Sequence, residues 1–292
     1  MYFVKNLIIF FLNIIENFRY KKIIKKEDIN ISNNHFYKED KNLKQFSDNG
    51  YIIIDDYISP DEIDEAKKNL RFNKKKNNWS YSTIVVQPKS LIERILKDEN
   101  IKKILIGYLG QDVKLDLIEA NMYSFNPETF SSSEKWHYDV VGKRIKIFLF
   151  LNDCDSIFTQ YIDGTNNILH SNYTSTKSRI SDNIIKKKYS KISKIIPKKG
   201  SLFIFDTNGF HKGVYRNSQI KDEKVKRYTI QMEFSSKSKS DKLVNLNCNS
   251  IGVRNIFFSN QCDFNNYLID KDYMNELVDE KIIFYDQEYS TY

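Results

Sequence analysis

From Val113 onward the chain is a series of short apolar segments separated by turn residues, with no helical pattern long enough to connect parallel strands. Six segments have the length and the β-branched or aromatic content of strands: Lys114–Phe125, Lys143–Leu151, Thr159–Ile162, Lys194–Ile196, Ser201–Phe205 and Arg227–Phe234. Without crossover helices, consecutive strands pair in antiparallel fashion. The pattern therefore favours an antiparallel sandwich or barrel.

Helical patterns are concentrated before these strands. The β-branched run Tyr51–Ile58 predicts a buried strand, and Ser59 followed by Pro60 predicts a helix start, with Ser as N-cap and Pro at the first helical position. Apolar residues at helical spacing predict a second helix over Lys89–Leu109. The lysine-rich segment 184–199 predicts a solvated loop, with an anion-attracting rim as the alternative. We expect an all-β core with flanking helices, an α+β arrangement.

The charge balance says little about partners. The 292 residues include 46 Lys and Arg against 38 Asp and Glu, a net charge of +8. The accompanying excess of Asn, Ile, Phe and Tyr is what A+T-rich codons produce, so we expect no nucleic-acid partner. A hydrophobic content of 40% excludes disorder as the main state. Three widely spaced cysteines form neither a disulfide framework nor a zinc motif, which predicts a reducing, cytoplasmic location.

Composition divides the chain into four parts. Residues 1–26 place apolar side chains at helical spacing among basic residues and predict an amphipathic helix. Its apolar run is about half of the roughly 20 residues that a spanning helix needs, and no signal-peptide cleavage site follows. A helix on the inner face of a membrane, and a helix packed on the domain or in a dimer, both fit. We expect a linker over residues 27–49, the folded domain over 50–262 and an acidic tail over 263–292.

Polar residues at three strand ends form a chemical pattern. His137 and Asp139 precede the strand over residues 143–151, and residues two apart face the same side of an extended chain. His211 follows another strand in a glycine-containing turn, and Arg227 begins the last strand with Thr229 two residues on. Together they would form a metal site of two histidines and one carboxylate, with a cationic clamp for a carboxylate nearby.

Each of these residues alone also has a plain structural interpretation. Histidines at strand ends and an aspartate in a turn are common features of β proteins, and it is their combination in order that favours a site. Arg216 is the rival to Arg227 as the clamp, but it falls in a loop rather than on a strand. His35 and His170 are typical loop residues, and Trp136 favours packing over contact with a substrate.

The chain resembles the phytanoyl-CoA dioxygenase family of Fe(II)/2-oxoglutarate-dependent oxygenases in two stretches, WHYD…KIFLFLND and GSLFIFDTNGFHKG…RYTIQMEF. A third stretch, GYIIIDDYISPDEID, resembles the strand and helix that open the family's domain. The likeness runs from about Gly50 to about Ser236, about two thirds of the chain. It implies a double-stranded β-helix, a cupin-like jelly roll of two antiparallel sheets with iron at one mouth.

The resemblance also implies roles for individual residues. It implies that His137, Asp139 and His211 bind Fe(II). It further implies that Arg227 pairs with the distal carboxylate of 2-oxoglutarate, which a bidentate guanidinium fits better than lysine does, and that Thr229 hydrogen-bonds the same carboxylate. Weaker candidates for contact with the cosubstrate precede or follow the metal motif: Asn121, Tyr123, Arg144 and Lys146.

The implied activity is that of a dioxygenase that consumes O2, releases succinate and CO2, and accepts ascorbate as an optional reductant. Asp139 stands where family halogenases have a small residue, so hydroxylation is favoured. The segment 155–167 departs from the family because a histidine is missing beside the turn Gly164-Thr165, and this leaves a small-molecule, lipid or glycan substrate open. The alternative is a catalytically silent jelly-roll binding protein. A nucleic-acid oxygenase is disfavoured because the lysine-rich segment has one aromatic residue, Tyr189.

Overall fold

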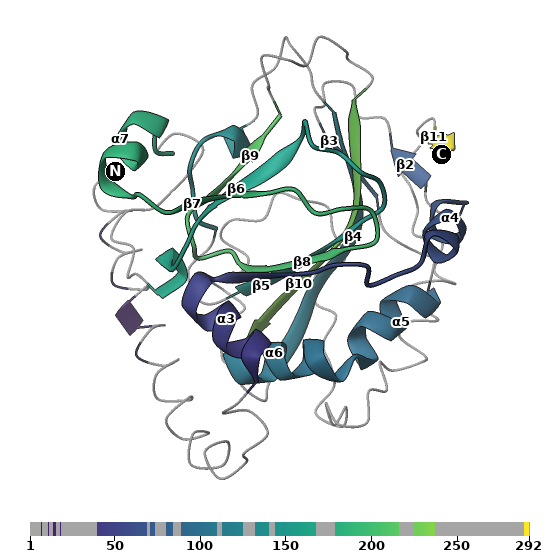
Figure 1. The fold of residues 1–292 in the computed structure, drawn as a ribbon, viewed down its shortest axis with the longest axis horizontal. Helices are drawn as coiled ribbons and strands as arrows, with labels where there is room; N and C mark the ends of the chain where they lie inside the picture. Colours follow the sequence, from purple (N-terminus) through teal and green to yellow (C-terminus); the bar gives the residue numbers. More distant parts are fainter. Residues whose placement is uncertain are drawn as a thin grey trace.

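The computed structural model describes residues 40–68, 71–73, 80–83, 89–109, 113–124, 132–139, 144–167, 179–215, 225–236 and 289–291, together with positions 7, 11, 14, 15 and 18. Two antiparallel sheets form the core (Figure 1). The larger sheet has six strands in the order β1 (Tyr51–Ile54), β8 (Leu202–Asp206), β5 (Arg144–Phe150), β10 (Lys226–Ser236), β4 (Val113–Ser124) and β3 (Ser80–Thr83). The smaller sheet has the order β7 (Ile192–Ile195), β6 (Phe158–Ile162) and β9 (His211–Val214). A separate pair joins β2 (Arg71–Asn73) to β11 (Tyr289–Thr291).

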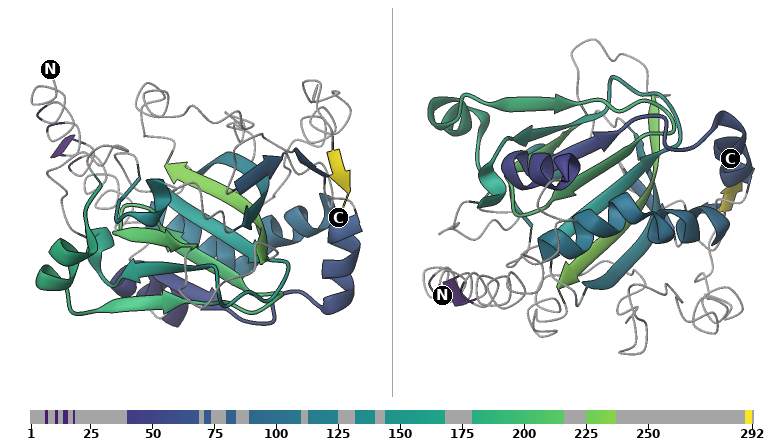
Figure 2. Two further views of the ribbon diagram at one scale, coloured as in Figure 1. Left: turned by 90° about the horizontal axis from the view of Figure 1, so that it is seen from above. Right: turned by 60° about the horizontal axis from the view of Figure 1, so that its bottom comes forward.

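The two faces of the larger sheet have different partners. Its outer face packs on helices, which Figures 1 and 2 show running across one side of the sheet: α3 (Lys41–Asn49), α5 (Lys89–Lys97) and α6 (Glu99–Leu109). Its inner face looks toward the smaller sheet. The strands alternate accordingly, because successive side chains of a strand point to opposite faces. On β10, Ile230, Met232 and Phe234 join the core with the helices, which turns Arg227 and Thr229 inward.

Aromatic side chains fill part of the space between the sheets. Phe148 and Phe150 of β5 and Phe203 and Phe205 of β8 pack against Tyr161 of β6. The outer-face residues of the same strands belong to the helix-facing core instead. An antiparallel sandwich with helices on one flank confirms the jelly-roll fold class expected from the sequence.

The helix start predicted at Ser59 is confirmed, and the long helix predicted over Lys89–Leu109 is two helices. Helix α4 (Pro60–Lys68) begins with a reciprocal cap, in which Glu62 N donates to Ser59 Oγ and Ser59 N donates to Glu62 Oε2. The break between α5 and α6 falls at Asp98, whose Oδ1 accepts from the amides of Asn100 and Ile101. Asp98 therefore starts a new helix although the apolar pattern continues across it.

The linker expected over residues 27–49 is wrong for its last nine residues, which form α3. Asp40 caps this helix by accepting from Leu43 N at 2.8 Å, and Phe46 is fully buried in edge-to-face contact with Tyr108. The helix ends at Gly50, whose φ of 85° and close approach to Tyr161 both exclude a side chain. Leu43 and Phe46 are three residues apart and pack on the same core, but two large apolar residues among polar ones are too few to distinguish this helix from a polar linker in the sequence.

Two further expectations changed at their boundaries. The strand expected over Tyr51–Ile58 ends at Ile54, because Asp55 and Asp56 form a turn in which Asp56 has a positive φ of 50°. The loop expected over residues 184–199 contains most of helix α7 (Asp182–Lys188), with exposed lysines and a buried Ile185, followed by β7. Within the described part of the chain, no helix has the length and apolar content needed to cross a bilayer. Most of the predicted acidic tail, as well as His35, His170 and Arg216, lies outside the described residues.

Candidate metal centre

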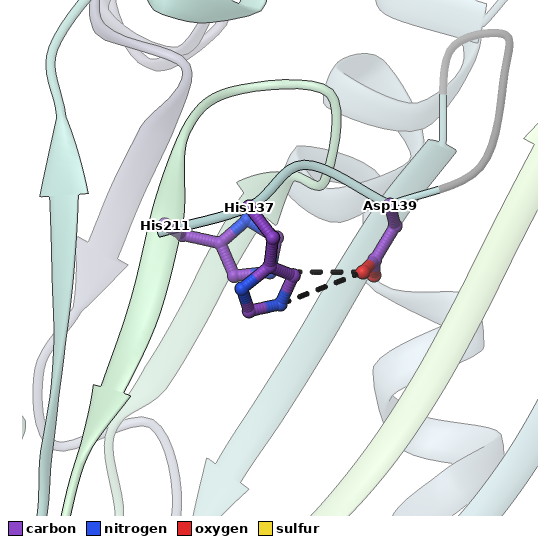
Figure 3. A group of neighbouring side chains, drawn as sticks. All are labelled: His137, Asp139 and His211. Carbon is purple, nitrogen blue, oxygen red and sulfur yellow. Dashed lines mark ion pairs between the residues drawn. The ribbon is translucent and has the colours of Figure 1, made fainter. Parts of the chain in front are cut away.

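The three predicted metal ligands come together from segments far apart in the chain. His137 and Asp139 lie in the extended segment before β5, and His211 is the first residue of β9. A pair of backbone hydrogen bonds joins the two histidines, from His137 N to His211 O at 3.0 Å and from His211 N to His137 O at 2.8 Å. Asp139 N donates to Thr207 O, which holds the carboxylate beside the imidazoles (Figure 3).

The side chains converge on one small volume. Asp139 Oδ1 lies 3.7 Å from His137 Nε2 and 4.0 Å from His211 Nε2. One ligand atom from each of the three residues falls within 4.8 Å of the others, a spacing that a single metal ion can bridge. The histidines are 5% and 6% exposed, so the pattern HxD with a distant histidine forms a buried cluster.

Hydrogen bonds fix which nitrogen of each histidine faces the centre. His137 Nδ1 lies 2.7 Å from the carbonyl of Lys135, and His211 Nδ1 lies 2.9 Å from the carbonyl of Gly209. A carbonyl can only accept, so Nδ1 carries the proton in both rings and Nε2 keeps its lone pair. Burial lowers the pKa of His211 to about 4, against an opposing effect of Asp139. Burial, with the neighbouring His211, also holds the pKa of His137 well below its ordinary value, and both rings are neutral at neutral pH.

The aspartate is held by its other oxygen. Asp139 Oδ2 accepts from Arg144 Nη2 and from Lys146 Nζ, each at 2.8 Å. Burial by itself raises the pKa of Asp139, but Lys146 and Arg144 outweigh it and hold this pKa well below its usual range. The carboxylate is therefore ionised and presents Oδ1 alone to the histidines.

Glu233, which no sequence pattern singled out, completes this group of charges. Its carboxylate lies 2.9 Å from Arg144 Nη1 and 3.1 Å from Lys146 Nζ, and it also accepts from Gln231 Nε2 at 2.6 Å. Arg144 and Lys146, named as weaker cosubstrate candidates, thus bridge Asp139 to Glu233. We call Asp139, Arg144, Lys146 and Glu233 the charge cluster. Two carboxylates balance two cations, which is the condition under which buried charges are tolerated.

Arg227 lies on the inner face of β10 in a different environment. It is 2% exposed, and its guanidinium carbon lies 4.7 Å from the ring centre of Tyr123 and 5.7 Å from that of Phe150. Its one hydrogen bond to a described residue is a long one, 3.4 Å from Nη1 to the carbonyl of Ile157. The buried Nε of Arg227 and the buried hydroxyl of Thr229 have no partner among the described residues, and neither does the guanidinium have a carboxylate there.

The two remaining cosubstrate candidates, Asn121 and Tyr123, lie on β4 beside Arg227 and Gln231. Tyr123 lies against Arg227, as above, and Asn121 donates from Nδ2 to Gln231 Oε1 at 3.2 Å. Both are buried on β4, opposite β10. They therefore line the same inner face that carries Arg227, and Asn121 connects to Glu233 through Gln231.

A second group missed by the sequence supports the histidines from outside. Asp182, at the start of α7, accepts from Trp136 Nε1 and from Lys212 Nζ, each at 2.6 Å to Oδ1. Trp136 is 1% exposed, so it packs as expected. These two donors are the chain neighbours of His137 and His211, and Asp182 thereby ties both metal-ligand segments to one carboxylate.

The segment 155–167, which lacks the histidine of the phytanoyl-CoA dioxygenase pattern, contacts the chain next to His211. The expected turn at Gly164-Thr165 is present, with Gly164 at a φ of 75°. Thr165 Oγ1 donates to Ile162 O and accepts from Phe210 N, directly before His211. This turn therefore helps to hold His211 without supplying a histidine of its own.

Solved structures with a similar fold include proteins crystallised with iron or with 2-oxoglutarate. The structure of EctD from S. alaskensis with bound Fe matches with a TM-score of 0.51 and 15% identity, over 70% of this chain and 78% of that one. HygX from Streptomyces hygroscopicus with nickel, 2-oxoglutarate and hygromycin B matches with a TM-score of 0.49 and 11% identity, over 70% and 93%. The epimerase SnoN from nogalamycin biosynthesis matches at 0.46 and 9%, over 67% and 82%. No family model and no curated protein matches the sequence. The likeness to EctD confirms the fold.

Proposed function

We propose that this protein is an Fe(II)- and 2-oxoglutarate-dependent oxygenase of the phytanoyl-CoA dioxygenase family that hydroxylates a small molecule, a lipid or a glycan intermediate. The observation that carries the proposal is the pairing of two features on one inner face. A buried His-Asp-His group presents three unprotonated ligand atoms, and a buried arginine with no carboxylate partner among the described residues lies on an adjoining strand.

The ligand set fits Fe(II). Two imidazoles and one carboxylate grouped on one side, with the other positions open, are typical of non-haem Fe(II) oxygenases. Metal binding requires deprotonated ligands, and here the pKa values of His137 and His211 are lowered by burial while Asp139 is kept ionised by its cations. The centre therefore needs no proton release to accept a metal at neutral pH.

Arg227 and Thr229 fit the distal carboxylate of 2-oxoglutarate. Among the described residues, neither the buried Nε of Arg227 nor the buried hydroxyl of Thr229 has a partner, and an anion would satisfy both, since an unpaired buried charge costs several kcal/mol. Thr229 and Glu233 are four residues apart on β10, about 13 Å along the strand. The proposed anion site and the charge cluster therefore lie along one face of the same strand. EctD, which has the same fold, is also solved with 2-oxoglutarate and 5-hydroxyectoine.

The chemistry follows from this arrangement. With Fe(II) bound, O2 oxidises 2-oxoglutarate to succinate and CO2, and one oxygen atom enters a C–H bond of the substrate. The chain's own residues would orient the reactants and exclude water. Arg227 and Thr229 would hold the cosubstrate, and the charge cluster leaves Asp139 Oδ1 for the metal because Oδ2 is bonded to the two cations of the cluster. Phe148 and Phe205 make the neighbouring space apolar. The presence of Asp139 favours hydroxylation over halogenation.

The test is an anaerobic titration of the metal-free protein with Fe(II) and 2-oxoglutarate, followed by the weak visible charge-transfer band of the chelated cosubstrate. We expect the band in the wild type, its loss in His211→Ala and its weakening in Arg227→Met, which preserves packing between Tyr123 and Phe150. The matched control is Arg94→Met, an exposed arginine on the helical side that pairs with Glu62. A folded wild type without the band, or equal bands in all three variants, would refute the proposal.

A further inference from the structure

The described positions of the N-terminal segment, residues 1–26, form an apolar face that is exposed to solvent. All five described positions in it are helical, and four of them are large apolar side chains that are widely exposed: Leu7 45%, Phe11 53%, Ile15 46% and Phe18 70%. At about 100° per residue, these positions and Ile14 fall within an arc of about 100° on one side of a helix. Exposed apolar residues scattered singly need no explanation, but a row on one helix face does.

A block of positive charge follows this face in the chain. Residues 17–26 contain five basic residues and no acidic one, and Lys5 precedes the apolar row. The basic residues of the block are Arg19, Lys21, Lys22, Lys25 and Lys26. The local excess of charge is far denser than the +8 of the whole chain, so codon usage alone does not account for it.

We propose that residues 1–26 bind the surface of an anionic lipid bilayer, with the row Leu7, Phe11, Ile15 and Phe18 inserted at the headgroup boundary and the basic block on the lipid phosphates. An apolar helix face flanked by lysine and arginine is the pattern of an interfacial helix. A second copy of the chain fits less well, because it offers an apolar face but no charge opposite to the basic block, and parallel pairing would bring two blocks of like charge together. The bilayer supplies both the apolar layer and the opposite charge.

The experiment is co-sedimentation of the full-length protein with phosphatidylcholine vesicles, with or without one part in four of phosphatidylglycerol. Two variants test the two halves of the proposal, Phe11→Glu/Phe18→Glu for the apolar face and Lys21→Gln/Lys22→Gln for the charge. The matched control, Ile53→Glu/Ile184→Glu, places the same two negative charges on exposed apolar residues elsewhere, which are 37% and 58% exposed. Circular dichroism confirms that each variant is folded, and no metal or cosubstrate is added, so the result is independent of the proposed oxygenase activity.

We expect the wild type to sediment with the anionic vesicles and to dissociate as salt is raised. Each basic residue near such a surface strengthens binding about fivefold, so Lys21→Gln/Lys22→Gln weakens it about 25-fold. Phe11→Glu/Phe18→Glu abolishes it, and the control binds as the wild type does. The proposal is overturned if the wild type does not sediment with anionic vesicles or if the control variant loses binding as well. It is also overturned if Phe11→Glu/Phe18→Glu dissociates a dimer and leaves vesicle binding intact.

Discussion

The inner face of β10 carries buried charge at both of its ends, and the two ends differ in how that charge is compensated. In the charge cluster, every ionised group lies within 3.1 Å of an opposite charge. At the other end, Arg227 is more deeply buried than any member of the cluster, but it has only aromatic rings and one carbonyl at 3.4 Å beside it among the described residues. The charges of one end are balanced within the cluster, whereas the proposed function assigns the balancing anion at the other end to 2-oxoglutarate.

The two ends would therefore have different physical roles: one holds side chains rigidly, and the other is stabilised by binding an anion. A balanced buried cluster holds its members in one arrangement, which here keeps Asp139 turned toward the histidines. An unbalanced buried cation lowers the free energy of unfolding of the ligand-free protein, and binding of an anion raises it again. Under the proposed function, the same strand therefore combines a rigid frame for the metal with a site for a carboxylate.

The largest effect is expected from unbalancing the complete end. Glu233→Gln removes one of the two carboxylates between Arg144 and Lys146, and we expect it to lower the free energy of unfolding by about 3–5 kcal/mol. The double variant Lys146→Met/Glu233→Gln restores neutrality and should recover most of that loss. Urea denaturation measures both. Equal losses in the single and the double variant would show that charge balance is not what the cluster provides.

The loss of unfolding free energy in Glu233→Gln should depend on pH. Burial raises the pKa of Glu233, but Arg144 and Lys146 outweigh it and lower this pKa below the ordinary 4.5. A carboxyl with a lowered pKa stabilises the fold above its unfolded pKa and loses that contribution as pH falls through its folded pKa. The difference in unfolding free energy between wild type and Glu233→Gln should therefore be constant down to about pH 5 and close below it. Denaturation at stepped pH checks this, and a difference that begins to close above pH 5 would contradict it.

At the Arg227 end, removing a charge should not lower the free energy of unfolding as it does in the charge cluster. Arg227→Met removes the unbalanced charge and keeps an apolar side chain between Tyr123 and Phe150. We expect affinity for 2-oxoglutarate to fall about a hundredfold, since truncating one partner of a buried charge pair costs about 2–5 kcal/mol. Stability without ligand should stay the same or rise by about 1 kcal/mol.

Calorimetric titration and urea denaturation of the same preparation separate these two quantities for Arg227→Met. Arg227→Lys serves as the control, because it retains the charge but cannot form a bidentate pair, and its affinity should lie between those of the other two proteins. If the empty Arg227→Met protein were less stable than wild type by several kcal/mol, Arg227 would belong to the frame and not to a ligand site.

The contrast between the ends also explains what the sequence could predict. His137 and Asp139 are two residues apart, and strand alternation alone puts them on one side, so their convergence was predictable locally. Glu233 was not, because an acid on a strand is equally typical of a solvent-facing position, and only the register that pairs it with Lys146 reveals its role. Helix α3 was not predicted because only Leu43 and Phe46 form its apolar face, and the partner that buries Phe46, Tyr108, comes from a distant helix.

The support of the histidines by Asp182 was likewise beyond sequence reasoning, and it provides the smallest of the expected effects. Asp182→Asn keeps an acceptor for Trp136 but removes the charge facing Lys212, whose side chain is largely buried. We expect Fe(II) affinity to fall about tenfold, as outer partners of metal ligands commonly contribute that much, with 2-oxoglutarate affinity of the metal-loaded protein unchanged. Asp182→Glu should restore part of the loss. The control is Asp163→Asn, which removes a carboxylate bonded to Ser193 on the same small sheet. A positioning role requires that metal affinity falls alone; a parallel fall in cosubstrate affinity and unfolding free energy would reduce Asp182 to a general structural contact.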